Sequence, residues 1–154
     1  MAAMWSNNAV QTVNPGETIV FTENPVPCTR GFVRHRDGSG NFLLAGKVCR
    51  KQCGCFPKSA NYLVNFGANI AIPTGGTVGA ISVAITLDGA TIPASEMEVT
   101  PAAVEEYFNV GRAVNADVWA GCCESLAIRN TSDQPILVKK AIVIFSRPDL
   151  NVTR

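Results

Sequence analysis

Residues 62–72, YLVNFGANIAI, decide the fold class of this chain of 154 residues. Every second side chain in this stretch, from Tyr62 to Ile72, is apolar, whereas Asn65, Gly67 and Asn69 stand between them. An alternation of period two is typical of a β-strand with one buried face and one wetter face. The proline and glycines of residues 73–76, PTGG, then end the strand as a turn.

The rest of the chain repeats this pattern of short strands and turns. Residues 81–87, ISVAITL, alternate in the same way and end at the turn residues Asp88 and Gly89. Residues 31–46, GFVRHRDGSGNFLLAG, predict a hairpin whose tip is formed by residues 37–40, DGSG. Further strands are predicted at residues 17–22, 113–121, 124–130 and 136–145.

Two segments depart from simple alternation. The pair Lys139 and Lys140 interrupts the last strand and predicts a bulge or a sheet edge. Residues 101–107, PAAVEEY, predict a helix of one or two turns, with Thr100 as its cap and Pro101 at its first position. About eight short strands and almost no helix predict an all-β chain that folds as one jelly-roll β-sandwich.

The composition predicts contact with other copies of the chain. Hydrophobic residues make up 47% of the sequence and charged residues only 16%, against about 25% charged residues in a typical soluble domain. Part of the apolar excess is therefore expected to face another subunit. The net charge of +1 comes with no basic block, which argues against nucleic acid and anionic membranes as partners.

The first residues bear on where the protein is made. Residues 1–17, MAAMWSNNAVQTVNPGE, contain no basic start followed by an apolar run, so we expect no signal peptide. No stretch approaches the roughly 20 continuous apolar residues of a transmembrane helix. We therefore expect synthesis in a cytoplasm, where structural disulfides are uncommon.

The cysteines are the first candidates for chemistry. Cys49, Cys53 and Cys55 lie within seven residues, and Cys28 or His35 could complete a tetrahedral zinc site. Structural zinc sites usually show two paired ligand blocks, and this chain has one irregular cluster. Free thiols, or a disulfide such as one from Cys28 to the cluster, are therefore favoured over zinc.

The remaining cysteines are the adjacent residues Cys122 and Cys123, which point to opposite sides of a strand. One is expected to be a small core residue and the other to be more exposed.

The other chemical candidates are weaker. His35 could pair with a thiolate for nucleophilic catalysis, but nothing in the sequence orients it, and a surface histidine is favoured. Trp5 and Trp119 are interpreted as interface or core anchors. Four acidic residues could form a catalytic carboxylate pair but are interpreted as solvated: Glu96, Glu98, Glu105 and Glu106. We assign no catalytic, cofactor-binding or metal-binding residue and predict that the protein is not an enzyme.

Five short motifs carry a resemblance to a known family. They are PCTRG at residues 27–31, HRDGSGNF at 35–42, ANIAIPTGG at 68–76, TPAAVEEY at 100–107 and GCC at 121–123. Together they resemble small proteins encoded by phages and prophages of Gram-positive gut bacteria, which are similar to trimeric jelly rolls of the tumour-necrosis-factor (TNF) and C1q type. The resemblance runs from about residue 24 to residue 146.

This resemblance implies a homotrimer in which each jelly roll packs one sheet edge along a threefold axis. We divide the chain into three regions: residues 1–16 as an N-terminal segment, residues 17–148 as the jelly-roll domain and residues 149–154 as a tail. The first region is a candidate anchor that would insert Trp5 into a capsid; the alternative is that it forms the first strand of the domain.

The function that the resemblance implies is structural. We predict a virion protein, assembled in the host cytoplasm, that acts as a trimeric capsid decoration or head-fibre protein and binds and reinforces the capsid surface. Its expected partner is the major capsid protein or another virion protein. The alternative is a receptor-binding tip of a tail or fibre that recognises a host surface ligand. A third hypothesis, an enzyme or a zinc-dependent regulator, rests on the cysteine cluster alone.

Overall fold

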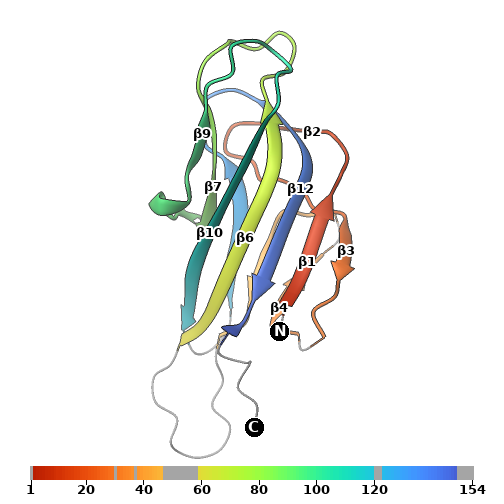
Figure 1. Cartoon of the computed structure of the whole chain (residues 1–154). Coiled ribbons are helices and arrows are strands. Elements are labelled where there is room, and N and C mark those ends of the chain that lie inside the picture. Colours follow the sequence, from red (N-terminus) through yellow and green to blue (C-terminus); the bar gives the residue numbers. More distant parts are fainter. Residues whose placement is uncertain (1, 30, 37, 47–58, 120–122, 149–154) are drawn as a thin grey trace, which may run out of the picture.

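A computed structural model describes residues 2–29, 31–36, 38–46, 59–119 and 123–148. The chain folds as two antiparallel β-sheets packed face to face (Figure 1). Sheet A has the order β10-β6-β12-β1-β3, and β2 also pairs with β12. Sheet B has the order β4-β5-β11-β7-β8, and β9 also pairs with β7.

The strands of sheet A are β1 (Ala2–Asn7), β2 (Gln11–Val13), β3 (Glu23–Val26), β6 (Ser59–Ala71), β10 (Phe108–Trp119) and β12 (Ile136–Ser146). The strands of sheet B are β4 (Val33–His35), β5 (Phe42–Leu44), β7 (Ile81–Leu87), β8 (Ala90–Thr91), β9 (Met97–Val99) and β11 (Glu124–Asn130). A single turn of 3-10 helix, η1 (Pro93–Ser95), precedes β9.

The strand predicted at residues 62–72 is confirmed and lies inside sheet A. β6 pairs with β10 along its length, from Phe108↔Ile70 to Trp119↔Ser59, and with β12 on its other side. The β4–β5 hairpin and the strands β7, β11 and β12 are also confirmed. The hairpin tip was predicted to include Asp37, which lies outside the described residues.

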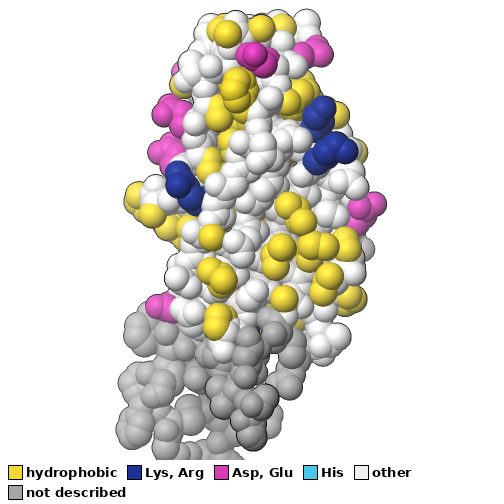
Figure 2. Space-filling view, in the orientation of Figure 1, with side chains coloured by type: hydrophobic (Ala, Val, Ile, Leu, Met, Phe, Trp, Pro, Cys, Tyr) yellow, Lys and Arg dark blue, Asp and Glu magenta, His cyan; other side chains and the backbone are white. Residues whose placement is uncertain are grey.

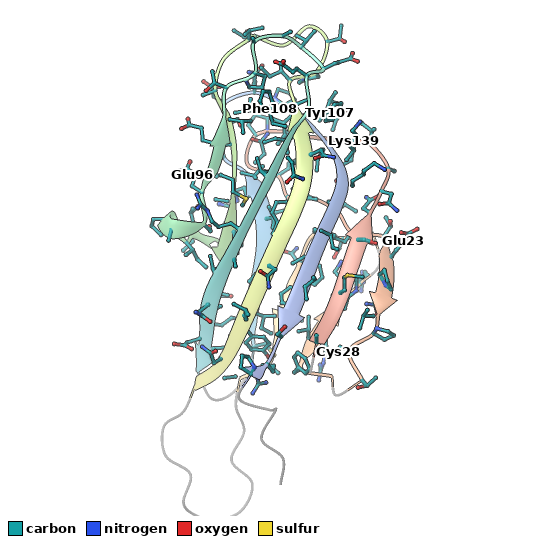
Figure 3. The ribbon with its side chains drawn as sticks, in the orientation of Figure 1. Glu23, Cys28, Glu96, Tyr107, Phe108 and Lys139 are labelled. Atoms are coloured by element: carbon teal, nitrogen blue, oxygen red, sulfur yellow. The ribbon has the colours of Figure 1, made fainter. Side chains whose placement is uncertain are left out.

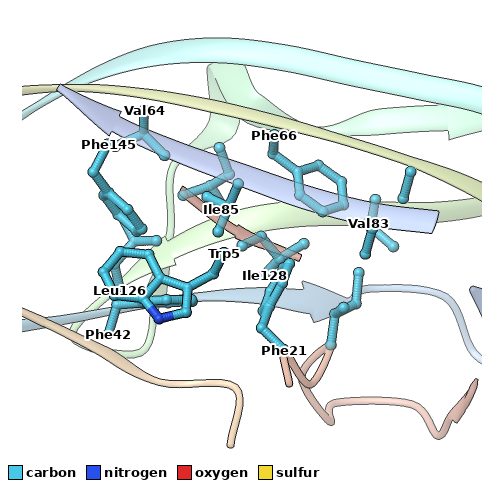
Figure 4. Close-up of a cluster of buried hydrophobic side chains, with 14 of the residues drawn as sticks. Trp5, Phe21, Phe42, Val64, Phe66, Val83, Ile85, Leu126, Ile128 and Phe145 are labelled. Atoms are coloured by element: carbon cyan, nitrogen blue, oxygen red, sulfur yellow. The ribbon is translucent and has the colours of Figure 1, made fainter. Parts of the chain in front are cut away.

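The core lies between the sheets and is rich in aromatic rings (Figure 4). The ring of Phe42 is the centre of the cluster: its centroid lies 5.1 Å from that of Trp5, 5.4 Å from that of Phe21 and 4.9 Å from that of Phe145. These rings come from both sheets and from the segment that follows β2. Edge and tilted contacts of this kind add to the stabilisation that burial alone provides.

The N-terminal residues belong to the sandwich. β1 pairs with β12 from Ala2↔Ser146 to Asn7↔Ala141, and the side chain of Trp5 is only 4% exposed. The described residues before Glu17 thus form two strands of sheet A, β1 and β2. An anchor that leaves the domain would have to break this ladder and expose Trp5.

Residues 17–22 do not form the regular strand that we predicted. They make two isolated bridges, Thr18↔Arg129 and Phe21↔Ser39, while Ile19 and Phe21 are fully buried. The apolar alternation thus gives the correct inward residues. The segment pairs first with β11 and then with the hairpin tip, so no single continuous ladder forms.

The helix predicted at residues 101–107 is wrong. The only helix in the described part of the chain is η1. Glu105 has a φ of 58°, and its N–H donates to the carbonyl of Ile72, the residue that follows β6. Seven residues do not offset the cost of nucleating a helix, and this long-range hydrogen bond fixes a loop in its place.

The bulge predicted at Lys139 and Lys140 is confirmed. The register between β12 and β6 shifts between Lys139 and Ile142, and Lys140 has a φ of 54°. Among the described residues, no helix has the length and apolar character that crossing a membrane requires.

Candidate functional site

The outer face of sheet A is a broad surface with few charges. Figure 2 shows this face, on which white and yellow side chains cover the centre and the charged groups lie towards the margins. Its apolar centre is formed by four half-buried side chains from three strands: Met4, Leu63, Ile142 and Ile144. We call these four residues the apolar patch.

The strand register brings the patch together. Met4 and Asn65 are the cross-strand partners of Ile144, while Ser6 and Gly67 are the partners of Ile142. Partners that are directly opposite one another have Cβ atoms about 4.5–5.5 Å apart. Leu63 on β6 pairs with Ser146 and is the diagonal neighbour of Ile144, so the patch extends across β1, β12 and β6. The polar groups next to it are neutral.

Charged side chains border this surface. Asp117 accepts a hydrogen bond from Asn61 Nδ2 at 2.8 Å near one end of the β6–β10 ladder. Ser6 Oγ lies 3.4 Å from Glu23 Oε1 at the β3 edge. Lys139 lies near the opposite end of β6. A neutral centre within a charged rim is the composition that buried protein interfaces show.

A second cluster lies at the end of the sandwich where Figure 3 labels Tyr107, Phe108 and Lys139. The Lys139 Nζ atom lies 4.0 Å from the centroid of the Tyr107 ring, a cation–π contact. Burial, and second the nearby Glu105 carboxylate, raise the pKa of Tyr107 above its ordinary value. The tyrosine therefore stays neutral beside Lys139 at physiological pH.

Of the six cysteines, the structure describes Cys28 and Cys123. Cys28, which Figure 3 labels below β3, is a half-buried free thiol. The alternative in which Cys28 forms a disulfide is therefore wrong. Cys123 is half-buried and disulfide-bonded. The cluster Cys49, Cys53 and Cys55 and the residue Cys122 lie outside the described residues.

His35 is more enclosed than the predicted surface histidine. Its ring stacks on Phe42, with centroids 4.3 Å apart and an interplanar angle of 19°. Its Nε2 lies 3.0 Å from the carbonyl oxygen of Ser39. Its Nδ1 is buried with no hydrogen-bond partner in the described structure. The ring also lies 5.6 Å from that of Trp5 on β1, centroid to centroid, and so links the β4–β5 hairpin to the core.

The four glutamates are exposed, as predicted, and two of them stabilise local structure through hydrogen bonds. Glu106 Oε1 accepts the N–H of Ala102 at 2.9 Å, and a Glu105 carboxylate oxygen accepts the hydroxyl of Thr74. Within the described residues, no group of three or more His, Cys, Asp or Glu side chains is placed to hold a metal ion. Trp5 is a core anchor, and Trp119 lies at the end of β10.

The sequence reasoning missed the apolar patch, although a signal was present. Residues 141–145, AIVIF, are continuously apolar, and a strand of this kind is covered on both faces. Val143 and Phe145 are buried inside, while Ile142 and Ile144 point outward.

No protein-family model and no curated protein matches the sequence. Solved structures do match its fold. The TNF protein Eiger of S. frugiperda is similar with a TM-score of 0.63 and 14% identity, over 100% of this chain and 98% of that one. Murine APRIL matches with a TM-score of 0.59 and 10% identity, over 96% of this chain and 99% of that one.

The globular domain of zebrafish complement 1qA matches with a TM-score of 0.56 and 10% identity, over 94% of this chain and 92% of that one. The fold is a jelly roll of the C1q and TNF type. The fold expected from the sequence motifs is thereby confirmed. At such low identity these matches establish the architecture alone.

Proposed function

We propose that this protein is a homotrimer that acts by binding and not by catalysis, with the outer face of sheet A at its subunit interface. The single observation that carries the proposal is the apolar patch at the centre of a face with few charges. A domain that is monomeric in water would leave this face exposed. The low charged fraction of the whole chain agrees with this assignment.

We further propose that the trimer is a phage virion protein, assembled in the host cytoplasm, that decorates the capsid or forms a head fibre. This step is supported by the sequence motifs that resemble phage and prophage proteins. One core cluster shared by both sheets also suits a part that reinforces a shell, because single domains of this size usually unfold as one cooperative unit. Its partner would be the major capsid protein or another virion protein.

The oligomer is tested by light scattering coupled to size-exclusion chromatography. The native chain is expected to have three times the mass of one chain. The double substitution of Ile142→Lys and Ile144→Lys is expected to give a folded monomer. It places two positive charges on the apolar patch of every subunit, and these charges would be buried if the trimer formed. A native chain that elutes as a monomer would refute the trimer.

Two further variants distinguish loss of the trimer from loss of folding. Val10→Lys adds a charge at an apolar side chain that is 57% exposed and outside the patch, and it should leave the trimer intact. Leu63→Asn changes the patch without adding charge and should weaken the trimer while the circular dichroism spectrum stays native.

The virion role is tested separately by quantitative mass spectrometry of purified particles. Copies that scale with the major capsid protein would support decoration. A few copies per particle would favour the alternative, a receptor-binding tip of a tail or fibre. Absence of the chain from particles would overturn both roles.

A further inference from the structure

A depression of about 590 Å³ lies on sheet B, the sheet opposite the apolar patch. Its walls come from the β4–β5 hairpin and from the start of β11. A volume between about 300 and 1,000 Å³ is typical of sites for small molecules. We call this depression the hairpin groove.

The groove carries two positive charges. Arg34 and Arg36 stand on either side of His35 in the sequence, and both arginine side chains are exposed. Among the described residues, no carboxylate forms an ion pair with either guanidinium. Guanidinium groups bind carboxylates and similar anions through paired, charge-assisted hydrogen bonds.

Neutral hydrogen-bonding groups and one apolar side chain complete the lining. Ser125 Oγ lies 3.4 Å from Asn41 Oδ1, which leaves the Asn41 amide nitrogen available to a ligand. Ser39 lies at the same wall. Leu43 is 43% exposed and is the cross-strand partner of both Arg34 and Ser125, so an apolar surface lies between the charged and the hydroxyl-bearing walls.

The hairpin that carries both arginines is held in place. The stacking of His35 on Phe42 fixes β4, and the N–H of Gly38 donates to the carbonyl of Phe21 at 3.0 Å. Gly40 lies against Thr18 and Ile19 so closely that a Cβ would be 2.7 Å from the Ile19 oxygen. A site on such a fixed element loses little conformational entropy when a ligand binds.

We propose that the hairpin groove binds an acidic saccharide. The sugar carboxylate would lie on Arg34 and Arg36, its hydroxyl groups would bond to Asn41 and Ser125, and a C–H face of the ring would cover Leu43. Nucleic acid is disfavoured, because two guanidiniums on a chain of net charge +1 give no track along a phosphate backbone.

The proposal does not depend on the oligomer or on the virion. All lining residues belong to one chain and to the sheet opposite the proposed subunit interface. Failure of the trimer or its absence from particles would therefore leave this experiment unchanged. A positive result would add weight to the receptor-binding role.

Binding is tested by NMR with sodium glucuronate as the probe and glucose as its neutral counterpart. The chain has one histidine, so the ring signals of His35 report on the groove without ambiguity. Millimolar glucuronate is expected to shift these signals and those of the arginine Nε groups, in a saturable way. Glucose should shift them at least tenfold less at the same concentration.

The double substitution of Arg34→Gln and Arg36→Gln should reduce glucuronate affinity at least tenfold. The matched control is Arg112→Gln, which removes an exposed arginine on β10 whose guanidinium donates to the Glu96 carbonyl. Equal losses in both variants, or no saturable shift with the native chain, would overturn the site.

Sodium sulfate serves as the competitor that separates an acidic sugar from any anion. Sulfate that displaces glucuronate only at much higher concentration supports the saccharide assignment. Sulfate that binds as well as glucuronate would overturn the sugar part and leave a general anion site. A glucuronate-containing polysaccharide that binds more tightly per residue than the free sugar would identify a polymer as the source.

Discussion

The indole ring of Trp5 packs edge-on against the phenyl ring of Phe145, with centroids 5.8 Å apart and an interplanar angle of 80°. This contact joins the first strand of the described chain to the last, and both rings are almost fully buried (Figure 4). The N-terminal residues are therefore part of the core that holds the sandwich together.

Replacement of Trp5 by alanine is expected to destabilise the fold by about 3–5 kcal/mol, because it leaves a large cavity among aromatic rings. The measurement is the midpoint of urea unfolding. It is followed by far-ultraviolet circular dichroism, which reports on the backbone and does not rely on the fluorescence of the tryptophan that is removed. Val10→Ala, at an exposed position, should change stability by less than about 0.5 kcal/mol. A Trp5→Ala variant as stable as the native chain would contradict the placement of β1.

Gly40→Ala is expected to destabilise the protein by about 1–3 kcal/mol through overpacking. The new Cβ would lie 2.7 Å from the Ile19 carbonyl oxygen and closer still to the Thr18 hydroxyl. Gly79 is the matched control, since a Cβ there meets nothing within 4 Å. Thermal unfolding of the two variants should separate them, with Gly79→Ala at or slightly above the native midpoint.

Ser95→Ala should cost about 1–3 kcal/mol, because it leaves the buried N–H of Ile85 without its hydrogen-bond partner. The Ser95 Oγ accepts the N–H of Ile85 at 2.8 Å and donates to the carbonyl of Ile92 at 2.6 Å. Hydrogen exchange at the Ile85 amide offers a local readout and should accelerate. Ser6→Ala, which removes a long, exposed hydrogen bond to Glu23, is expected to be neutral.

The raised pKa of Tyr107 predicts that the free energy of unfolding falls in alkaline solution. Its pKa is raised in the folded protein, first by burial and then by Glu105, so the folded state favours the neutral phenol. The contribution to stability is complete below about pH 10, the unfolded pKa, and disappears as the pH rises through the higher folded pKa. Denaturant unfolding between pH 9 and pH 11 should show this slope, and Tyr107→Phe should remove it.

The contribution of Glu105 is checked by absorbance at 295 nm. Glu105→Gln should lower the pKa of Tyr107 part of the way towards its ordinary value, because the burial remains. Glu98→Gln, at an exposed position on β9, should leave the titration unchanged. An unchanged titration in the Glu105→Gln variant would show that burial alone raises the pKa.

The strands β6 and β7 could be predicted from sequence because an apolar side chain stands at every second position, although the small side chains between them in β7 are buried as well. The alternation in β6 and the turn residues around β7 are local signals, and each strand formed where it was expected. The segment at residues 101–107 had helical signals, but a single long-range hydrogen bond from Glu105 to Ile72 overrides them. Local propensity carries no information about such a tertiary contact.

The site was harder to predict, because its residues are brought together only by strand register. Met4 and Ile144 are cross-strand partners, yet 139 residues separate them in the chain. Arg34 and Arg36 were visible beside His35, but their common face with Leu43 and Ser125 follows from the order of sheet B. Neither surface has a motif of fixed spacing.

The central place of β12 also has a consequence for folding during synthesis. β12 lies between β6 and β1, so sheet A stays divided into two unfinished halves until this strand has left the ribosome. A nascent chain that stops before residue 136 would expose the unpaired edges of both β6 and β1, which invite aggregation. A subunit can therefore complete sheet A only after its last described strand has been translated. Chains that lack this strand cannot reach the native fold.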